Sequence, residues 1–176
     1  MEFFEVIKKR YSHKEKFLPD PVPLSDLERI AEAGLYAPTG ANTQCVRLIL
    51  LPDREILQPL CDIAPTDGLR TAPAAIAVFT DTFAVDSKFK FELEDYAAAV
   101  ENMLLAAVAL GYVSLWLDGP YFSGENRKAA HHLLGAPTGY YLHAVLPIGK
   151  PDGPGSRREK IPFEERISYR YYGNGK

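Results

Sequence analysis

Between a helix-like segment and an apolar run lies the stretch Ala37-Pro38-Thr39-Gly40-Ala41-Asn42-Thr43-Gln44. Its residues are small, polar or backbone-permissive, and Pro38 fixes the direction in which the chain enters the loop. Asn42 and Gln44 each carry a carbonyl acceptor and an amide donor. That combination suits a flat ring with alternating N–H and C=O edges, such as a pyrimidine or an isoalloxazine. A structural turn would explain the same residues taken alone, so the surrounding sequence has to decide.

A short basic run lies upstream of this loop, after an expected helix over residues 2–9. The run reads Arg10-Tyr11-Ser12-His13-Lys14, and a solvated charged turn would explain it. An anion site would also explain it, because a guanidinium holds phosphate with two prongs, serine adds a hydroxyl and lysine adds a point charge. A second basic cluster follows a Gly/Pro-rich loop near the end of the chain and comprises Arg157, Arg158 and Lys160.

Length and composition predict one domain over residues 1–176, and a net charge of -3 argues against a general nucleic-acid binder. The two cysteines, Cys45 and Cys61, form no CxxC motif, and charges from Glu2 onward leave no signal-peptide core. The most apolar stretch, residues 96–117, carries a glutamate and is typical of a buried helix followed by a strand rather than a membrane span. We therefore expect a soluble, cytoplasmic protein in a reducing compartment.

Helical and strand patterns are mixed along the chain. A capping box, Ser25-Asp26-Leu27-Glu28, predicts a helix that ends near Tyr36. Asp53 is suited to cap another helix through Ile63, although Pro59 would interrupt its interior. Such a mixture in one domain predicts an α+β or α/β layered fold. Apolar runs of strand length cover residues 45–51, 74–80, 112–117 and 141–148, and helical patterns cover residues 94–110 and 126–134.

Several common catalytic and nucleotide-binding motifs are missing from the sequence. It has no GxGxxG after a strand, no GxxxxGK[ST], no HExxH and no GxSxG. Cys45 opens an apolar strand, which favours a buried small side chain over a nucleophile. His131 and His132 lie near a helix end and are typical of surface or cap residues. The remaining features place phosphate-binding groups at one end and amide groups at the other, as a mononucleotide-like ligand requires.

Taken in order, these motifs resemble the FMN-dependent nitroreductase family. The run Lys9-Arg10-Tyr11-Ser12-His13-Lys14 resembles the family's R-x-S-x-[KR] start, and the stretch from Tyr36 to Gln44 resembles its A-P-S-x-x-N-x-Q-P signature. The resemblance covers nearly the whole chain. Its later members are Asn102-Met103-Leu104-Leu105-Ala106-Ala107, Leu110-Gly111, Leu117-Asp118-Gly119 and Arg157-Arg158.

The resemblance implies that the basic residues hold the FMN phosphate. Arg10 and Ser12 would contact it, joined by Arg157 or Arg158. Tyr11 would belong to the same site, at a position where the family often has a basic residue. The match thus assigns to one ligand two clusters that are far apart in the sequence.

The resemblance also implies contacts to the flavin ring. Lys14 would lie near the N1/C2 carbonyl, where a cation stabilises the reduced, anionic flavin. Pro38, Thr39 and Asn42 would line the ring and its polar edge. Gln44 would brace the loop or reach the ribityl chain.

The implied function is that of an FMN-dependent oxidoreductase. The main chain at Asp118-Gly119 would approach flavin N5, and no side-chain acid or base is required. NAD(P)H would reduce FMN, and a nitroaromatic, a quinone or a related small acceptor would then reoxidise it in a ping-pong sequence. One alternative is a flavin-binding or sensing protein with little turnover, and another is a different flavin reaction such as reductive dehalogenation. Cys45-Val46-Arg47 stands where the family usually has Pro and an aromatic residue, which leaves the packing of the loop open.

The implied fold is a central mixed sheet flanked by helices, in an intertwined homodimer. FMN would lie at the dimer interface, with the N-terminal and loop residues from one subunit and others from its partner. The apolar helix over residues 94–110 would become dimer core, and the β-prone tail over residues 167–172 would add a strand to the partner's sheet. The brief region between Asp81 and Glu94 favours an open substrate pocket for a small acceptor.

Overall fold

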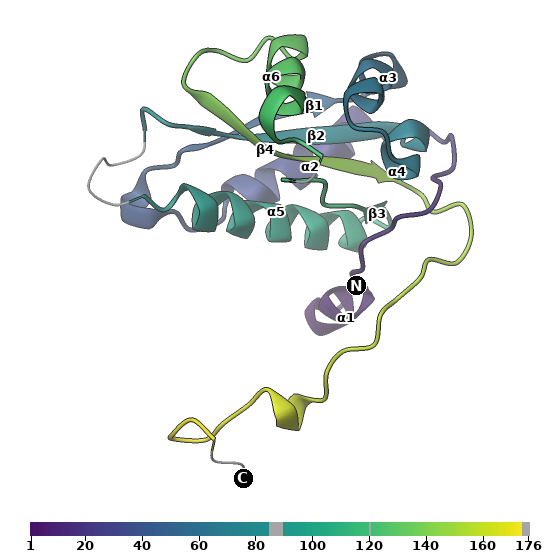
Figure 1. Ribbon diagram of the computed structural model, residues 1–176. Coiled ribbons are helices and arrows are strands. Elements are labelled where there is room, and N and C mark those ends of the chain that lie inside the picture. The colour runs from purple at the N-terminus through teal and green to yellow at the C-terminus, as the bar shows by residue number, and fades with distance from the viewer. Residues whose placement is uncertain (85–89, 120, 174–176) are drawn as a thin grey trace.

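In the computed structural model, which describes residues 1–84, 90–119 and 121–173, four strands form one sheet in the order β1-β2-β4-β3 (Figure 1). All pairings between these strands are antiparallel, so the expected mixed sheet is corrected to an antiparallel one. The parallel contact that remains is an isolated bridge between Ser12 and Ser114. The strands are β1 (Val46–Leu51), β2 (Ala74–Asp81), β3 (Val113–Ser114) and β4 (Tyr140–Gly149).

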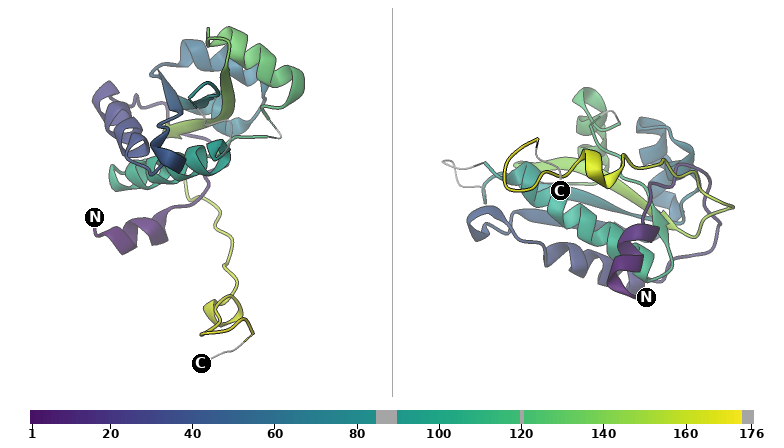
Figure 2. Two further views of the ribbon diagram at one scale, coloured as in Figure 1. Left: turned by 90° about the vertical axis from the view of Figure 1, so that its left-hand side faces the viewer. Right: turned by 90° about the horizontal axis from the view of Figure 1, so that it is seen from below.

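Helices cover both faces of this sheet, which makes the fold a layered α+β one (Figures 1 and 2). Helices α2 and α5 pack on one face, and α3, α4 and α6 pack on the other. None of the helices in the described ranges is long and apolar enough to cross a membrane. The helices are α1 (Phe3–Lys9), α2 (Leu24–Leu35), α3 (Arg54–Ile63), α4 (Asp67–Thr71), α5 (Glu92–Ala109) and α6 (Gly124–Leu133), with 3₁₀ turns η1 (Gly40–Asn42) and η2 (Phe163–Glu165).

The structure decides two predictions about helix ends and interiors, one for α2 and one for α3. The predicted capping box at Ser25 is wrong, because α2 already begins at Leu24 after Pro23, and no side chain caps it. Proline sets an extended entry and suits the start of a helix, so Ser25, the second residue of α2, already lies inside the helix and cannot cap it. Pro59 lies inside α3, which continues through it. The carbonyl that loses its hydrogen bond belongs to Glu55 in the exposed first turn, where water can replace the missing donor.

Helix α5 lies beneath the sheet in the view of Figure 1, and we call it the helix floor. One side of it buries apolar residues against the sheet and α2, as the nearly continuous apolar pattern predicts. The approach to α2 is close at Gly34, where a Cβ would lie 2.7 Å from Met103 Cγ. The side of α5 that faces away from the sheet meets α1 near its C-terminal half.

The chain after β4 leaves the domain as an arm (Figures 1 and 2). Residues 167–172, which were predicted to add a strand to a partner's sheet, form bends and turns with exposed side chains in this single chain. A strand needs a neighbouring strand to bond its backbone, so the prediction of a strand shared with a partner stays a prediction. The predicted strand over residues 112–117 is reduced to β3, after which Leu117 makes an isolated bridge with Val145.

Candidate functional site

The basic run and the C-terminal basic cluster meet in a cavity of about 460 Å³, which we call the basic cavity. The two clusters are nearly 150 residues apart in sequence, so folding of the arm across the N-terminal segment creates this site. All but one of the charged residues in the wall are cationic, as an anion site requires. The wall consists of Lys8, Arg10, Tyr11, Ser12, Lys14, Glu15, Ser156, Arg157, Arg158 and Lys160.

Arg157 ties the arm to the N-terminal segment. Its guanidinium donates to the carbonyl oxygens of Lys8 (3.0 Å) and Lys9 (2.7 Å), which are the last residues of α1. It also lies 4.7 Å from the centre of the Tyr11 ring. A cation at a helix C-terminus bonds carbonyls that have no partner in the helix. Arg157 therefore shapes the cavity, and the Arg158 side chain is part of its wall.

Two acidic groups balance the cavity. Arg10 lies 3.4 Å from Glu101 of α5, which fixes the arginine against the helix floor. The Glu15 carboxylate accepts from the backbone N–H groups of Lys14 (3.0 Å) and Ser156 (3.2 Å). Backbone hydrogen bonds, the one from Glu15 itself first, lower the pKa of Glu15. The carboxylate thus orders the loop and stays charged beside the cations.

The segment with the Asn42 and Gln44 amides forms a tight loop over residues 39–45, which we call the clamp loop. Three of its non-glycine residues have left-handed backbone conformations: Ala41 (φ 51°), Asn42 (φ 55°) and Gln44 (φ 48°). Within the loop, the Gln44 N–H donates to Thr39 Oγ1 at 3.0 Å, and the side chains of Gln44 and Asn42 lie 3.4 Å apart. Residues held in sparsely populated conformations cluster at ligand sites.

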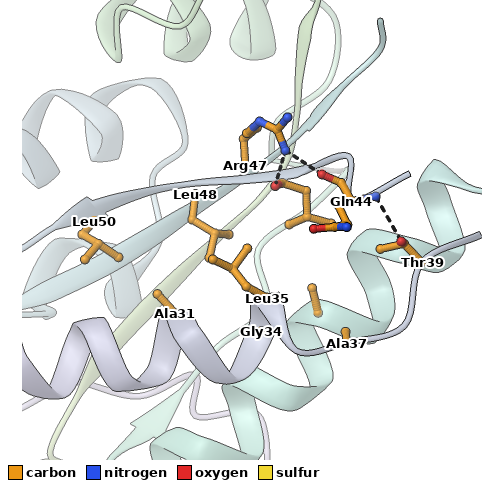
Figure 3. A pocket seen from close by; sticks show the side chains of 11 residues that line it. Ala31, Gly34, Leu35, Ala37, Thr39, Gln44, Arg47, Leu48 and Leu50 are labelled. Atoms are coloured by element: carbon orange, nitrogen blue, oxygen red, sulfur yellow. Dashed lines mark hydrogen bonds between the residues drawn. The ribbon is translucent and has the colours of Figure 1, made fainter. Parts of the chain in front are cut away.

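A second cavity, of about 440 Å³, lies between α2 and β1 beside the clamp loop (Figure 3). Its wall is mostly aliphatic, and Thr39 and Gln44 supply polar groups at one end. Arg47, the one polar residue of β1, donates to Gln44 O at 2.6 Å and lies 3.4 Å from Asp81. Figure 3 shows this side chain next to Gln44, so the Arg47 guanidinium stabilises the end of the clamp loop.

The predicted site residues therefore fall into separate places within one chain. The basic cavity is fixed to α5 at Glu101, whereas the clamp loop is fixed to α5 at Asp95, about 9 Å away along the helix axis. The two cavities described above share no wall residue. The N-terminal and loop residues, which were expected to act together from one subunit, line different cavities in the single chain, and their shared contact with one ligand stays a prediction.

Asp118 and Gly119 lie at a third place, just after Leu117 is joined to Val145 by two backbone hydrogen bonds of 3.1 and 2.9 Å. Among the described residues, apart from the chain neighbours of Gly119, no atom would lie within 4 Å of a Cβ at this position, so this side of its main chain is left open for a ligand. Upstream in the same segment, Ser114 Oγ and Trp116 Nε1 are buried and have no hydrogen-bond partner. Ser114 pairs with Ser12 of the basic cavity. Unpaired buried polar atoms call for a ligand or water, and these two lie on the path from the phosphate residues to Gly119.

Sequence reasoning missed a buried aromatic cluster and a buried acid. A bulge in β4 leaves His143 without a partner residue in β2, and its ring stacks on Tyr96 with centroids 4.2 Å apart. His143 Nε2 lies 2.8 Å from Thr80 Oγ1. Burial, and then the nearby Arg127 charge, lower the pKa of His143 to about 4. For His143 the sequence signal was a titratable side chain inside the apolar run over residues 141–148. Asp95, which follows Glu94 in an acidic segment, gave no such signal and is described below.

Among the described residues, no group of three or more His, Cys, Asp or Glu side chains is arranged to hold a metal ion. Cys45 and Cys61 are both free and buried, as expected for Cys45. Burial, followed by the hydrogen bond to Asp95, raises the pKa of the Cys45 thiol to about 11. A thiol with that pKa is a poor nucleophile near neutral pH.

The sequence profile of the nitroreductase family matches residues 7–65 and 64–150, which is most of the chain. The chain therefore belongs to the nitroreductase family. An Archaeoglobus fulgidus protein with the provisional name NADH dehydrogenase/NAD(P)H nitroreductase is 38% identical over 128 residues, 72% of each chain. A Desulfovibrio desulfuricans structure, provisionally named a nitroreductase and solved in complex with FMN, superimposes with a TM-score of 0.79 at 28% identity and covers 98% of both chains.

A more distant relative carries a different activity in its name. The iodotyrosine deiodinase of Thermotoga neapolitana is 25% identical over 190 residues, 93% of this chain and 95% of its own. Family membership thus fixes the fold and the class of oxidoreductase, and it leaves the acceptor open.

Proposed function

We propose that the chain is an FMN-dependent oxidoreductase that takes electrons from NAD(P)H and passes them to a small acceptor such as a nitroaromatic or a quinone. The observation that carries this proposal is the basic cavity, joined through Ser12 and Ser114 to the open main chain at Gly119. A phosphate at one end and a flat ring at the other match that layout. The relatives named above, one of them with bound FMN, support the same reading.

The residues present fit FMN. Arg10, Ser12 and Arg158 would hold its phosphate, with Tyr11 and Arg157 forming the wall behind it. Bound FMN would supply the hydride-transfer chemistry at N5. Trp116 Nε1, buried and without a partner, offers a donor to a polar group of the ligand.

The protein contributes position and charge. Lys14, in the wall of the basic cavity, would stabilise negative charge on the ring's N1/C2 edge. The clamp loop would place Pro38, Thr39 and Asn42 against the ring, with Gln44 bracing the loop from behind. The main chain of Asp118 and Gly119 would face N5, and its open surface leaves room for the nicotinamide or the acceptor.

We further propose that a homodimer completes the site. One chain keeps the basic cavity and the clamp loop apart, and a second copy would bring its loop to the first chain's cavity. Helix α1 exposes Phe3 (60%) and Phe4 (66%), and the arm exposes Phe163 (62%) and Tyr171 (75%), which is unusual for side chains that face water. The arm would then find the edge strand β1 of the partner. A reducing cytoplasm fits the two free thiols.

An absorbance spectrum tests the proposal. The purified protein, supplied with FMN, is expected to show bound-flavin absorbance that bleaches when NADH or NADPH is added without oxygen. Absence of bound flavin would overturn the site assignment. Bound flavin that neither pyridine nucleotide reduces would instead favour a flavin-binding or sensing role. Reoxidation with a nitroaromatic, a quinone and a halogenated phenol would then separate the acceptors, the last because a deiodinase is among the relatives.

A further inference from the structure

Asp95 is the one acidic side chain buried in the described part of the chain, at 4% exposure. It lies in the first turn of α5, and its carboxylate points at the clamp loop. Oδ1 accepts from the Gly40 N–H at 2.8 Å, and Oδ2 accepts from the Thr43 hydroxyl and the Cys45 thiol, both at 3.3 Å. Three donors from one short loop thus converge on a single carboxylate.

Among the described residues, Asp95 forms no ion pair with a lysine, arginine or histidine. A buried carboxylate that is matched only by neutral donors loses its hydration without gaining an opposite charge. For packing alone, an apolar or amide side chain would serve at least as well. The presence of the charge therefore calls for a role that depends on these particular hydrogen bonds.

The clamp loop needs external support. Ala41 and Gln44 have left-handed backbone conformations, which residues other than glycine usually avoid. The loop also presses on α5, because a Cβ on Gly40 would lie 2.2 Å from the Phe91 ring. Asp95 bonds the residues on both sides of the left-handed pair Ala41 and Asn42, so it holds the loop at the points where it would otherwise relax.

We propose that Asp95 is a positioning residue for the flavin ring: it holds the clamp loop so that Thr39, Asn42 and Gln44 meet the ring, without touching the ligand itself. This inference rests on the proposed function. Phosphate binding at the basic cavity is fixed to α5 separately, through Arg10 and Glu101, and does not use Asp95. Ring binding and phosphate binding should therefore respond differently to its loss.

The test compares three probes on the full-length protein: FMN, lumiflavin (the ring without ribityl phosphate) and inorganic phosphate. Asp95→Asn keeps the shape and removes the charge. We expect the dissociation constants of FMN and lumiflavin to rise about tenfold, as for a lost set of charge-assisted hydrogen bonds. Stabilisation by millimolar inorganic phosphate, read as a shift of the melting temperature, should stay as in the wild type. Glu94→Gln is the matched control, because it removes a charge from the neighbouring, exposed residue of α5.

Milder variants cover the case in which Asp95→Asn does not fold. Thr43→Val and Cys45→Ala each remove one donor, and each should weaken lumiflavin about threefold with phosphate stabilisation unchanged. Unchanged lumiflavin affinity in all three variants, or an equal loss for inorganic phosphate, would overturn the proposal for Asp95. Wild-type protein that binds neither FMN nor lumiflavin would overturn the proposed function instead, which keeps the two failures distinct.

Discussion

The basic cavity and the clamp loop are the two halves of the candidate site, and they are built on opposite principles. The cavity gathers charged side chains on exposed segments, α1 and the C-terminal arm, whose own packing is slight. The loop presents neutral amides and hydroxyls, and its one charge, Asp95, is buried behind it. Charges attract a phosphate over several ångströms without exact placement, whereas hydrogen bonds to a ring edge require it.

This contrast shows which part of the site needs its binding groups to be placed precisely. The cavity can rest on exposed segments because its interaction with a phosphate is electrostatic and needs no exact placement. The loop is strained and fixed to the helix floor because its interaction is directional. Perturbing the cavity should change how strongly a ligand binds, and perturbing the loop should change which part of the ligand is recognised.

Deleting residues 161–176 is expected to have the largest effect, because it removes the exposed arm but keeps Arg157 and Arg158. The shortened chain should still fold, since the core lies within the sheet and its helices. Self-association should weaken at least about 100-fold, because the buried apolar anchors of an interface carry most of its affinity. Analytical ultracentrifugation measures this, with FMN binding followed in parallel.

Deletion of residues 174–176 alone is the control for this truncation. It should leave the dimer intact. A shortened chain that remains a dimer and binds FMN normally would show that the arm does not hold the partner, and the two halves of the site would then have to meet in another way.

The double variant Arg10→Ala and Ser12→Ala should raise the FMN dissociation constant about 100-fold, or about 3 kcal/mol, because it removes charge-assisted hydrogen bonds to the phosphate. Lumiflavin binding should be unchanged, since that ligand lacks a phosphate. Ser25→Ala with Arg29→Ala is the matched control on α2, outside both cavities. Equal FMN affinity in the two double variants, measured by fluorescence titration, would contradict the phosphate assignment.

The sequence predicted most of the core but not the support of the site. The apolar runs located the four strands that the structure has, although the run over residues 112–117 contains only the short strand β3. These predictions succeed because burial imposes a local period on the chain. The carboxylate of Asp95 could not be linked to Gly40, because their contact spans 55 residues and depends on how α5 lies beneath the loop.

The same limit explains the error in strand direction, and it leaves the joint placement of the site residues as a prediction. Strand direction was expected to be mixed, but direction depends on how the connections run and not on the composition of each strand. The placement of Arg10 and Asn42 near one ligand followed their order in a motif. Order along the chain does not say whether two segments meet in one copy or across two, and the structure separates them within one copy.

His143 makes the region near the loop sensitive to acid, which the exposed cavity is not expected to share. The imidazole has a pKa of about 4 in the folded protein and about 6.5 when unfolded. Below pH 6.5 the unfolded chain therefore binds a proton first, and stability falls as the pH falls. Between pH 7 and pH 5 this should cost about 2 kcal/mol of unfolding free energy.

His143→Phe keeps a ring beside Tyr96 and should remove this acid sensitivity, although it leaves Thr80 without its partner and lowers stability at pH 7 by about 1 kcal/mol. Urea unfolding at pH 7, 6 and 5 measures the difference. His132→Gln, an exposed residue of α6, is the control and should keep the wild-type slope. A wild-type slope in His143→Phe as well would assign the acid sensitivity to another group.

Cys45 offers the smallest and most local test of the difference between the two halves. Its pKa of about 11 leaves roughly one thiol in a thousand ionised at pH 8, so in a Cys61→Ala background the folded protein should react very slowly with a disulfide reagent. Asp95→Asn should speed this reaction, because it removes the negative charge that helps to keep the neighbouring thiol protonated. Arg10→Ala should not speed the reaction, since the basic cavity lies elsewhere on α5.

Cys45→Ser keeps a donor to Asp95 and should change lumiflavin affinity less than about threefold. Equal thiol reactivity in the Asp95 and Arg10 variants would mean that the clamp loop and the cavity are coupled, and the division of roles between them would fail.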